Sequence, residues 1–265
     1  MTESASRDYL WLNLRALPYF RGLLRAVEAR FYQEYPLEGP TLDLGCGDGD
    51  FAAITFEHNL KVGLDPWTGP VHRAAKLGIY DLTVLGSGDR MPFEAGTFNS
   101  AFSNSVLEHI PDVEAVLQDV GRVLKPGSLF LFCVPNHNFL NNLSVSNFLD
   151  KMGLRGLADA YRRFFNRISR HYHCDSPEVW QERLGKAGFR IEKYWHYFSP
   201  RALAVLEWGH YFGLPALVAH AFFGRWILAP YRWNFALTNA IVKPIYAEQA
   251  EHPQGSYTFY VVRRV

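Results

Sequence analysis

The feature that most constrains this chain is a series of glycines that follows a short apolar run. Residues 42–44 hold the apolar run, Gly45, Gly47 and Gly49 come next, and a helical pattern begins over residues 51–56. Glycine accepts backbone angles closed to other residues and lets a ligand approach the main chain. The first turn of a helix offers unpaired N–H groups. The order of strand, glycine turn and helix therefore predicts a nucleotide-binding crossover in an α/β fold.

An acid at the expected distance agrees with this prediction. Asp65 ends the next apolar run, residues 60–64, about twenty residues beyond the first glycine, where such units place a ribose-binding carboxylate. A strand-ending Asp also occurs as an ordinary turn residue, but the spacing favours the binding role. Asp43, Asp48 and Asp50 would repel a pyrophosphate, so they favour a ligand that carries an ammonium and a sulfonium group.

The segment 41–51 resembles motif I of the class I S-adenosylmethionine (SAM) dependent methyltransferases of the methyltransferase-11 type. The resemblance covers residues 40–134 and resumes over residues 170–198. It implies SAM as the cofactor, S-adenosylhomocysteine as its product and methyl transfer as the reaction. The residues that we assign to cofactor binding are Asp43, Gly45, Cys46, Gly47, Asp65, Pro66, Trp67, Asp89, Arg90 and Asn104.

The resemblance also implies individual roles around the nucleoside. Asp65 would accept hydrogen bonds from the ribose hydroxyls, while Pro66 and Trp67 would flank the adenine. Asp89 would accept from the adenine amino group, and the backbone N–H of Arg90 would meet a ring nitrogen. A solvated loop acid is the alternative for Asp89.

Three histidines are candidates for a general base, because histidine titrates near neutral pH. They are His109, which follows the fourth predicted strand, and His171 and His173 before a later helix. Some related O-methyltransferases bind a divalent metal through a Glu-x-x-Glu-His run. Glu108 and His109 match its last two positions, but Ser105 stands where the first glutamate would be. We therefore expect no metal site.

The totals exclude several classes of protein. The net charge of +1 over 265 residues leaves no overall basic footprint for nucleic acid. Cys46, Cys133 and Cys174 are far apart, as in a reduced cytoplasmic protein without a zinc site. Glu3 and neighbouring charges replace the apolar region of a signal peptide, so we expect no leader. The expected location is the cytoplasm, with membrane association left open.

Two segments depart from the common core. Residues 136–170, the lid segment, combine apolar residues at helical spacing with a basic face that includes Arg162 and Arg163. Residues 199–256, the second insert, are aromatic and apolar, and residues 208–224 contain no Asp, Glu, Lys or Arg. That run is too short and too interrupted for a good membrane span. The second insert could fold back onto the lid segment over the cofactor.

Three uses of these segments remain open at this point. They form a site for a lipid-like acceptor drawn from a membrane surface, a closed cavity for a soluble hydrophobic acceptor, or a packing surface that includes a homodimer contact. The basic face of the lid segment is otherwise a solvated helix face. O-methylation is weakly favoured over N- or C-methylation, and no residue names the acceptor.

The sequence thus predicts one α/β domain over residues 1–265. Its Rossmann-like sheet has seven strands with the last one antiparallel, helices on both faces and mainly helical insertions. The predicted function is SAM-dependent methyl transfer to a small, hydrophobic acceptor without nucleic acid. A SAM-binding scaffold or regulator without methyl transfer is the alternative, because the glycine turn and the adenine-side acids serve binding in both cases.

Overall fold

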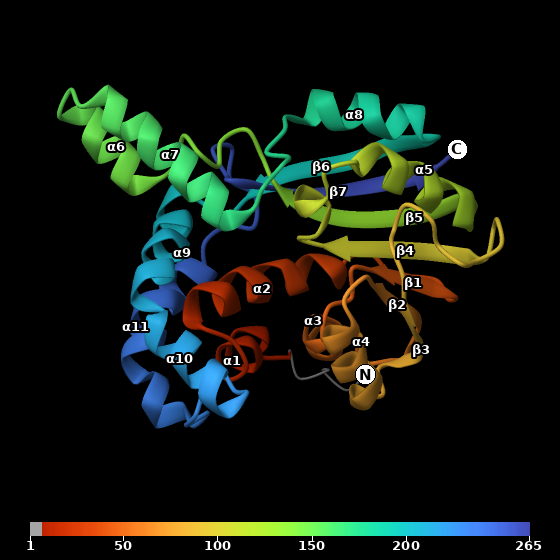
Figure 1. Cartoon of the computed structure of the whole chain (residues 1–265), viewed down its shortest axis with the longest axis horizontal. Coiled ribbons are helices and arrows are strands. Elements are labelled where there is room, and N and C mark those ends of the chain that lie inside the picture. Colours follow the sequence, from red (N-terminus) through yellow and green to blue (C-terminus); the bar gives the residue numbers. More distant parts are fainter. Residues whose placement is uncertain (1–6) are drawn as a thin grey trace.

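The computed structural model describes residues 7–265, so Glu3 of the expected leaderless N-terminus lies outside the described residues. Seven strands form one sheet in the order β3-β2-β1-β4-β5-β7-β6 (Figure 1). Strands β1 to β5 are parallel, and β7 runs antiparallel to both β5 and β6, as the sequence predicts. The strands are β1 (Thr41–Leu44), β2 (Leu60–Asp65), β3 (Tyr80–Leu85), β4 (Phe98–Asn104), β5 (Leu124–Pro135), β6 (Phe189–Tyr197) and β7 (Tyr257–Arg264).

Helices cover both faces of the sheet (Figure 1). Strand β5 has apolar side chains on both faces, and helices cover them. Leu131 and Cys133 belong to the core cluster on one face, while Phe130 and Phe132 belong to the cluster on the other. A strand buried on both faces reads as a continuous apolar run, which is how β5 appears in the sequence. One face carries α1 (Tyr9–Leu14), α2 (Tyr19–Tyr32), α3 (Asp50–Thr55) and α4 (Thr68–Leu77), and the other carries α5 (Val113–Val123) and α8 (Pro177–Lys186).

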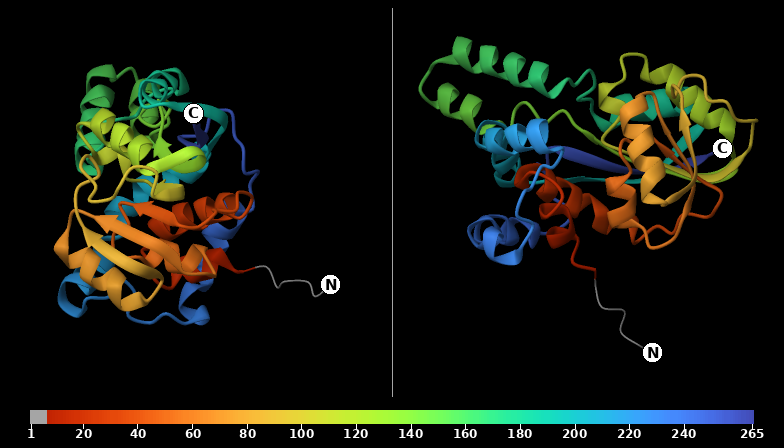
Figure 2. Two further views of the ribbon diagram at one scale, coloured as in Figure 1. Left: turned by 90° about the vertical axis from the view of Figure 1, so that its right-hand side faces the viewer. Right: turned by 60° about the horizontal axis from the view of Figure 1, so that its bottom comes forward.

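The two inserted segments form a group of helices at one end of the molecule, beyond the carboxyl ends of the parallel strands (Figures 1 and 2). We call this group the helical end. The lid segment supplies α6 (Ser144–Lys151) and α7 (Arg155–Ser169). The second insert supplies α9 (Pro200–Phe212), α10 (Leu214–Phe223), the short helix η2 (Arg232–Phe235) and α11 (Ala236–Tyr246).

The second insert does fold back onto the lid segment. The hydroxyls of Tyr161 on α7 and Tyr211 on α9 lie 2.9 Å apart. Glu207 of α9 is fully buried, and its carboxylate accepts hydrogen bonds from the backbone N–H groups of Ser144 and Val145. A carboxylate at a helix start satisfies donors that have no intrahelical partner. A buried carboxylate on one insert therefore fixes the start of α6 on the other.

Local sequence signals set three of the helix boundaries. Helices α1 and α2 meet at Pro18. Helix α5 ends at Val123, because Leu124 already pairs with Phe98 of β4. Ser176 occupies the position before α8, but its side chain makes no capping hydrogen bond there.

Candidate active site

A cavity of about 900 Å³, the cofactor cavity, lies at the carboxyl ends of β1, β2 and β4. The strand order reverses at β1, so this is the crevice where open α/β sheets bind ligands. Every residue that the sequence assigns to the cofactor lines the cavity, except Arg90. The backbone N–H of Arg90 faces the carbonyl of Ser87 at 3.4 Å instead.

Gly45 and Gly47 of the glycine turn line this cavity. Gly45 has a φ of 77°, and a Cβ placed on it would lie 2.5 Å from a methyl group of Val106. Gly47 has a φ of 55°, but a Cβ there would meet no atom within 4 Å. Only glycine adopts such angles freely. Gly45 therefore packs against the protein, whereas Gly47 leaves open space on the ligand side.

The side chain of Asp65 is held in place from both sides. It accepts hydrogen bonds from the backbone N–H of Gly47, at 3.0 Å, and from that of Trp67, at 2.9 Å. It is nearly buried, while the Trp67 ring is 70% exposed. Each carboxylate oxygen keeps a further lone pair for a ligand. This arrangement suits a carboxylate that receives two ribose hydroxyls.

Deeper in the cavity, Asp43 is buried and accepts a hydrogen bond of 2.6 Å from the Tyr80 hydroxyl. Burial raises the pKa of Asp43 to about 7, against the lowering effect of that bond. A buried carboxylate with so high a pKa gains from a nearby positive charge. Asp43 therefore fits the positively charged part of a ligand, and exposed Asp89 lines the same cavity.

A second cavity of about 370 Å³, the acceptor cavity, adjoins the first. Its polar end includes Ser105, Glu108, His109 and His171. Its remaining wall is largely apolar and comes from α2, the lid segment and the second insert. The side chains shared by both cavities are Arg21, Arg25, Ser105, His109 and Trp226.

The three candidate histidines have different surroundings. The Nδ1–H of His109 donates to the Arg170 carbonyl at 3.0 Å, which leaves Nε2 with a free lone pair. Burial lowers the pKa of His109, and burial with the neighbouring histidines lowers the pKa of His171 to about 3. His173 lines neither cavity in the described part of the chain. Its ring nitrogens face the Ile110 carbonyl, at 2.9 Å, and Asp175, at 3.4 Å.

Comparison with known proteins finds relatives for the core of the chain. Residues 42–132 match a family described as a methyltransferase domain. The chain is similar to a sterol 4-C-methyltransferase of Caenorhabditis elegans, with 33% identity over 97 residues, and to a 24-methylenesterol C-methyltransferase of Arabidopsis thaliana, with 38% identity over 98 residues. Each match covers 34% of this chain. The chain spans 29% and 27% of the lengths of these relatives.

The fold agrees with the match. A solved structure of a SAM-dependent methyltransferase from Mesorhizobium loti superposes with a TM-score of 0.54 at 17% identity, over 92% of this chain and 100% of that one. The chain contains a class I SAM-dependent methyltransferase domain. Its cofactor is SAM, and the open face of Gly47, the poised Asp65 carboxylate and buried Asp43 fit the cofactor's hydroxyls and positive charges.

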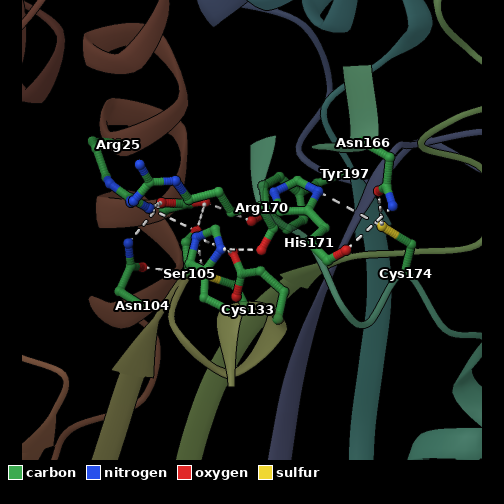
Figure 3. Close-up of polar contacts among 12 residues, drawn as sticks. Arg25, Asn104, Ser105, Cys133, Asn166, Arg170, His171, Cys174 and Tyr197 are labelled. Atoms are coloured by element: carbon green, nitrogen blue, oxygen red, sulfur yellow. Dashed lines mark hydrogen bonds and ion pairs between the residues drawn. The ribbon is translucent and has the colours of Figure 1, made fainter. Parts of the chain in front are cut away.

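The methyltransferase domain also holds a polar network that the sequence analysis missed (Figure 3). Its centre is the fully buried carboxylate of Glu28 on α2. Glu28 accepts hydrogen bonds from Arg25, at 2.7 Å, from Asn104, at 2.8 Å, and from the Tyr197 hydroxyl, at 2.8 Å. Glu28 follows Arg25 by three residues on the apolar face of α2. That placement of two charges was the available signal.

This network fixes the wall between the two cavities. Arg25 also donates to the Ser105 hydroxyl at 2.7 Å, and Ser105 has a φ of 52°, which is uncommon for a residue with a side chain. Asn104 is held by Glu28 and accepts from the Cys133 thiol at 3.1 Å (Figure 3). The network thus fixes the position of Asn104 where it lines the cofactor cavity.

Three side chains of the domain form a possible donor set for a cation. Glu108, His109 and His171 each place one donor atom within 4.8 Å of the others. Glu108 Oε2 has no hydrogen-bond partner within residues 7–265. The sequence argued against a metal because of Ser105, whereas His171 brings a third donor from a distant segment. However, the positive charge of Arg25 acts on both Glu108 and His109, and it opposes a second cation there.

Proposed function

We propose that this chain transfers the methyl group of SAM to a hydroxyl group of a small, hydrophobic, lipid-like acceptor. The observation that carries the proposal is that the two cavities meet at Ser105 and His109. Methyl transfer from a sulfonium is an in-line displacement with a good leaving group. Alignment of the two reactants is therefore the main requirement, and contiguous cavities supply it.

The lining of the acceptor cavity supports an acceptor with one polar end. Ser105, Glu108 and His109 lie toward the cofactor cavity, and apolar side chains form the far wall. Burial of apolar surface provides most of the affinity for such a molecule, while a few polar groups orient it. The apolar lining residues include Phe139, Ile168, Leu206, Leu214, Leu217 and Trp226.

In this proposal His109 is the general base. Its Nδ1–H is committed to the Arg170 carbonyl, and its lowered pKa, caused mainly by burial, keeps the ring neutral at pH 7. Bound SAM supplies an electrophilic methyl group. His109 Nε2 removes the proton of the acceptor hydroxyl as the oxygen–methyl bond forms, and the electrons of the sulfur–methyl bond remain on sulfur.

Glu108 stays close to this base without competing with it. Burial raises the pKa of Glu108 to about 8, so the carboxyl is mostly protonated at neutral pH. Its Oε1 lies 3.8 Å from His109 Nε2, too far for a hydrogen bond. The lone pair of the base therefore remains available to the acceptor.

A second candidate is methyl transfer to carbon. This candidate is favoured by the similarity to two relatives whose names describe C-methylation of sterols. Those names also favour a lipid-like acceptor. In C-methylation of an alkene, the base removes a proton from carbon after the new bond forms, so His109 would act later in the reaction. The position of the methyl group in the product distinguishes the two candidates.

The test is a methyl-transfer assay with radiolabelled SAM and a panel of hydrophobic alcohols and sterols, with products identified by mass spectrometry and NMR. We expect His109→Ala to lower kcat about 10²- to 10⁴-fold, with little change in SAM affinity. His173→Ala is the matched control, because His173 lines neither cavity in the described part of the chain. It should change kcat no more than a few-fold.

Other outcomes point elsewhere. Full activity of His109→Ala across pH 6 to 9 would contradict base catalysis by this residue. Tight SAM binding without transfer to any acceptor in the panel would favour the scaffold or regulator. Addition of a chelator should leave the rate unchanged, and loss of activity that Mn²⁺ restores would show that Glu108, His109 and His171 hold a cation.

A further inference from the structure

The second insert has an unusual charge pattern. Residues 208–247 contain no Asp or Glu, whereas Arg225, Arg232 and Lys243 give the same stretch three cations, of which Arg232 pairs with Asp8. Most protein surfaces mix both signs of charge. A long stretch without acids is attractive to an anionic surface.

The same stretch exposes large apolar side chains. Within residues 7–265, α10 buries none of its residues, and it is the most apolar helix of the second insert. Soluble monomers rarely expose large apolar patches unless a partner covers them. Figure 2 shows this part of the chain at the margin of the molecule. The side chains that are at least 60% exposed include Phe212, Leu214, Phe222, Phe223, Trp233 and Leu237.

We propose that α10 and the segment that follows it, through residue 243, dock into the interface of an anionic lipid bilayer. Apolar side chains would enter the boundary between headgroups and acyl chains, while Arg225 and Lys243 would face lipid phosphates. Trp208, Phe212 and Leu237 also line an open apolar groove of about 630 Å³ between α9 and α11. That groove fits a lipid acyl chain.

The helices of the second insert favour an interfacial position over a spanning one. Within the described residues, no single helix is long and apolar enough to cross a membrane, and α9 and α10 pass that test only as a pair bent by 55°. Helix α9 cannot leave the protein freely, because Leu203 and Leu206 are buried and Glu207 holds the start of α6. Helix α10, about 15 Å long, is shorter than the bilayer core.

The lid segment contributes less to this surface than its sequence suggested. Arg162 of α7 forms ion pairs with Asp150 and Asp159, which neutralise part of the basic face. Arg163 is exposed. Charge reversal at Arg162 would thus break contacts within the protein, so it is a poor probe of membrane binding.

Docking through α10 would bring the acceptor cavity to the bilayer. Leu214 and Leu217 of α10 line that cavity, while Phe222 and Phe223 of the same helix are exposed to solvent. A lipid-like acceptor could then pass from the bilayer along α10 into the cavity. This delivery step rests on the proposed function, whereas the docking itself does not.

The test is co-sedimentation of the full chain with phosphatidylcholine vesicles that contain about one third phosphatidylserine. We expect binding at low salt that weakens as salt screens the charges. The double variant Phe222→Ser/Phe223→Ser should weaken partitioning about 100-fold, since each buried phenyl group contributes strongly. Arg225→Glu should weaken it about 5-fold. Leu82→Ser, an exposed apolar residue on the distant strand β3, is the matched control and should bind like the wild type.

Circular dichroism and SAM affinity confirm that each variant is folded. Protein that stays in the supernatant at low salt overturns the proposal, as does equal binding by the double variant. A wild-type dimer that becomes monomeric in the double variant, without vesicle binding, assigns the surface to a second copy of the chain. Vesicle binding without methyl transfer to any acceptor leaves the docking intact and contradicts the proposed function.

Discussion

The sheet half of the molecule, residues 41–135, and the helical end hold their ligand-facing groups by different means. In the sheet half, backbone geometry sets the positions: Gly45 needs a positive φ, and Asp65 is fixed by two main-chain N–H groups. In the helical end, the cavity wall consists of side chains on helices with large exposed surfaces. Few residue types satisfy the backbone geometry of the cofactor site, whereas many combinations of apolar residues can form a cavity wall. The sequence therefore predicts the cofactor but does not identify the acceptor.

The sharpest test of this contrast compares two glycines with positive φ. Gly45→Ala would force a Cβ to within 2.5 Å of Val106 and would strain the backbone. We expect at least about a 100-fold loss of SAM affinity and about 2 kcal/mol or more of stability. Gly153→Ala, in the turn between α6 and α7, has a φ of 78° and open space. It should cost only about 1 kcal/mol and leave SAM affinity unchanged. Calorimetry and thermal unfolding measure both.

Removal of the ribose-side carboxylate should have the next largest effect. Asp65→Ala would remove a charged acceptor, and we expect SAM and S-adenosylhomocysteine to bind about 10- to 100-fold more weakly. Asp81→Ala is the matched control, because Asp81 is an exposed Asp on the neighbouring strand β3 that pairs with Lys61. Isothermal calorimetry reports both affinities. Equal affinities for wild type and Asp65→Ala would remove this residue from the cofactor site.

Glu108, which lies between the sheet half and the helical end, should make the stability of the protein depend on pH. Burial raises the pKa of Glu108 from 4.5 to about 8, so the folded state holds a proton that the unfolded state has released. This contribution is complete below pH 4.5 and is lost as pH rises through 8. Stability should fall by up to about 1.4 kcal/mol per pH unit within that window.

Glu108→Gln separates this contribution from others, because glutamine does not titrate. Between pH 7 and 8 the urea unfolding free energy of this variant should change less than that of the wild type. Asp43, with a pKa raised by burial to about 7, acts in the same direction at lower pH. His171, with its pKa lowered by burial to about 3, acts oppositely below pH 6.5. Parallel curves for the variant and the wild type would contradict a raised pKa at Glu108.

The smallest expected effect concerns the acceptor wall. Leu217→Ala would remove part of the apolar surface that α10 gives to the acceptor cavity, while its side chain is half exposed. We expect KM for the acceptor to rise about 5-fold, equivalent to about 1 kcal/mol, with an unchanged Kd for SAM. A change in SAM affinity instead would mean that the acceptor wall also contributes to cofactor binding.

The sequence predicted the sheet and the glycine turn, and nine of the ten residues that it assigned to the cofactor line a single cavity. It could do so because strand ends, turns and spacings are local properties of the chain. It did not predict the contributions of Arg25, Glu28 and Trp226. These residues reach the site from α2 and the second insert, and their positions depend on how helices pack over the sheet. Arg25 and Glu28 were nevertheless visible as charges within an apolar helical stripe.

The histidines show the same division. The sequence proposed His109, His171 and His173 as candidate bases, because histidine titrates near neutral pH. Only the packing of Arg170 against His109, and of Asp175 against His173, distinguishes a ring with a free nitrogen from one with both nitrogens engaged. No spacing in the chain encodes that difference.

The C-terminal part of α10 has one more consequence. The rings of His220 and Trp226 stack at 4.1 Å, and both side chains line the cofactor cavity, while Leu214 and Leu217 at the start of the helix line the acceptor cavity. Helix α10 thus lines both cavities, so we expect SAM to bind before the acceptor and S-adenosylhomocysteine to leave last. Steady-state kinetics should accordingly be compulsory-order, and product-inhibition patterns that fit random addition would contradict that sequence of events.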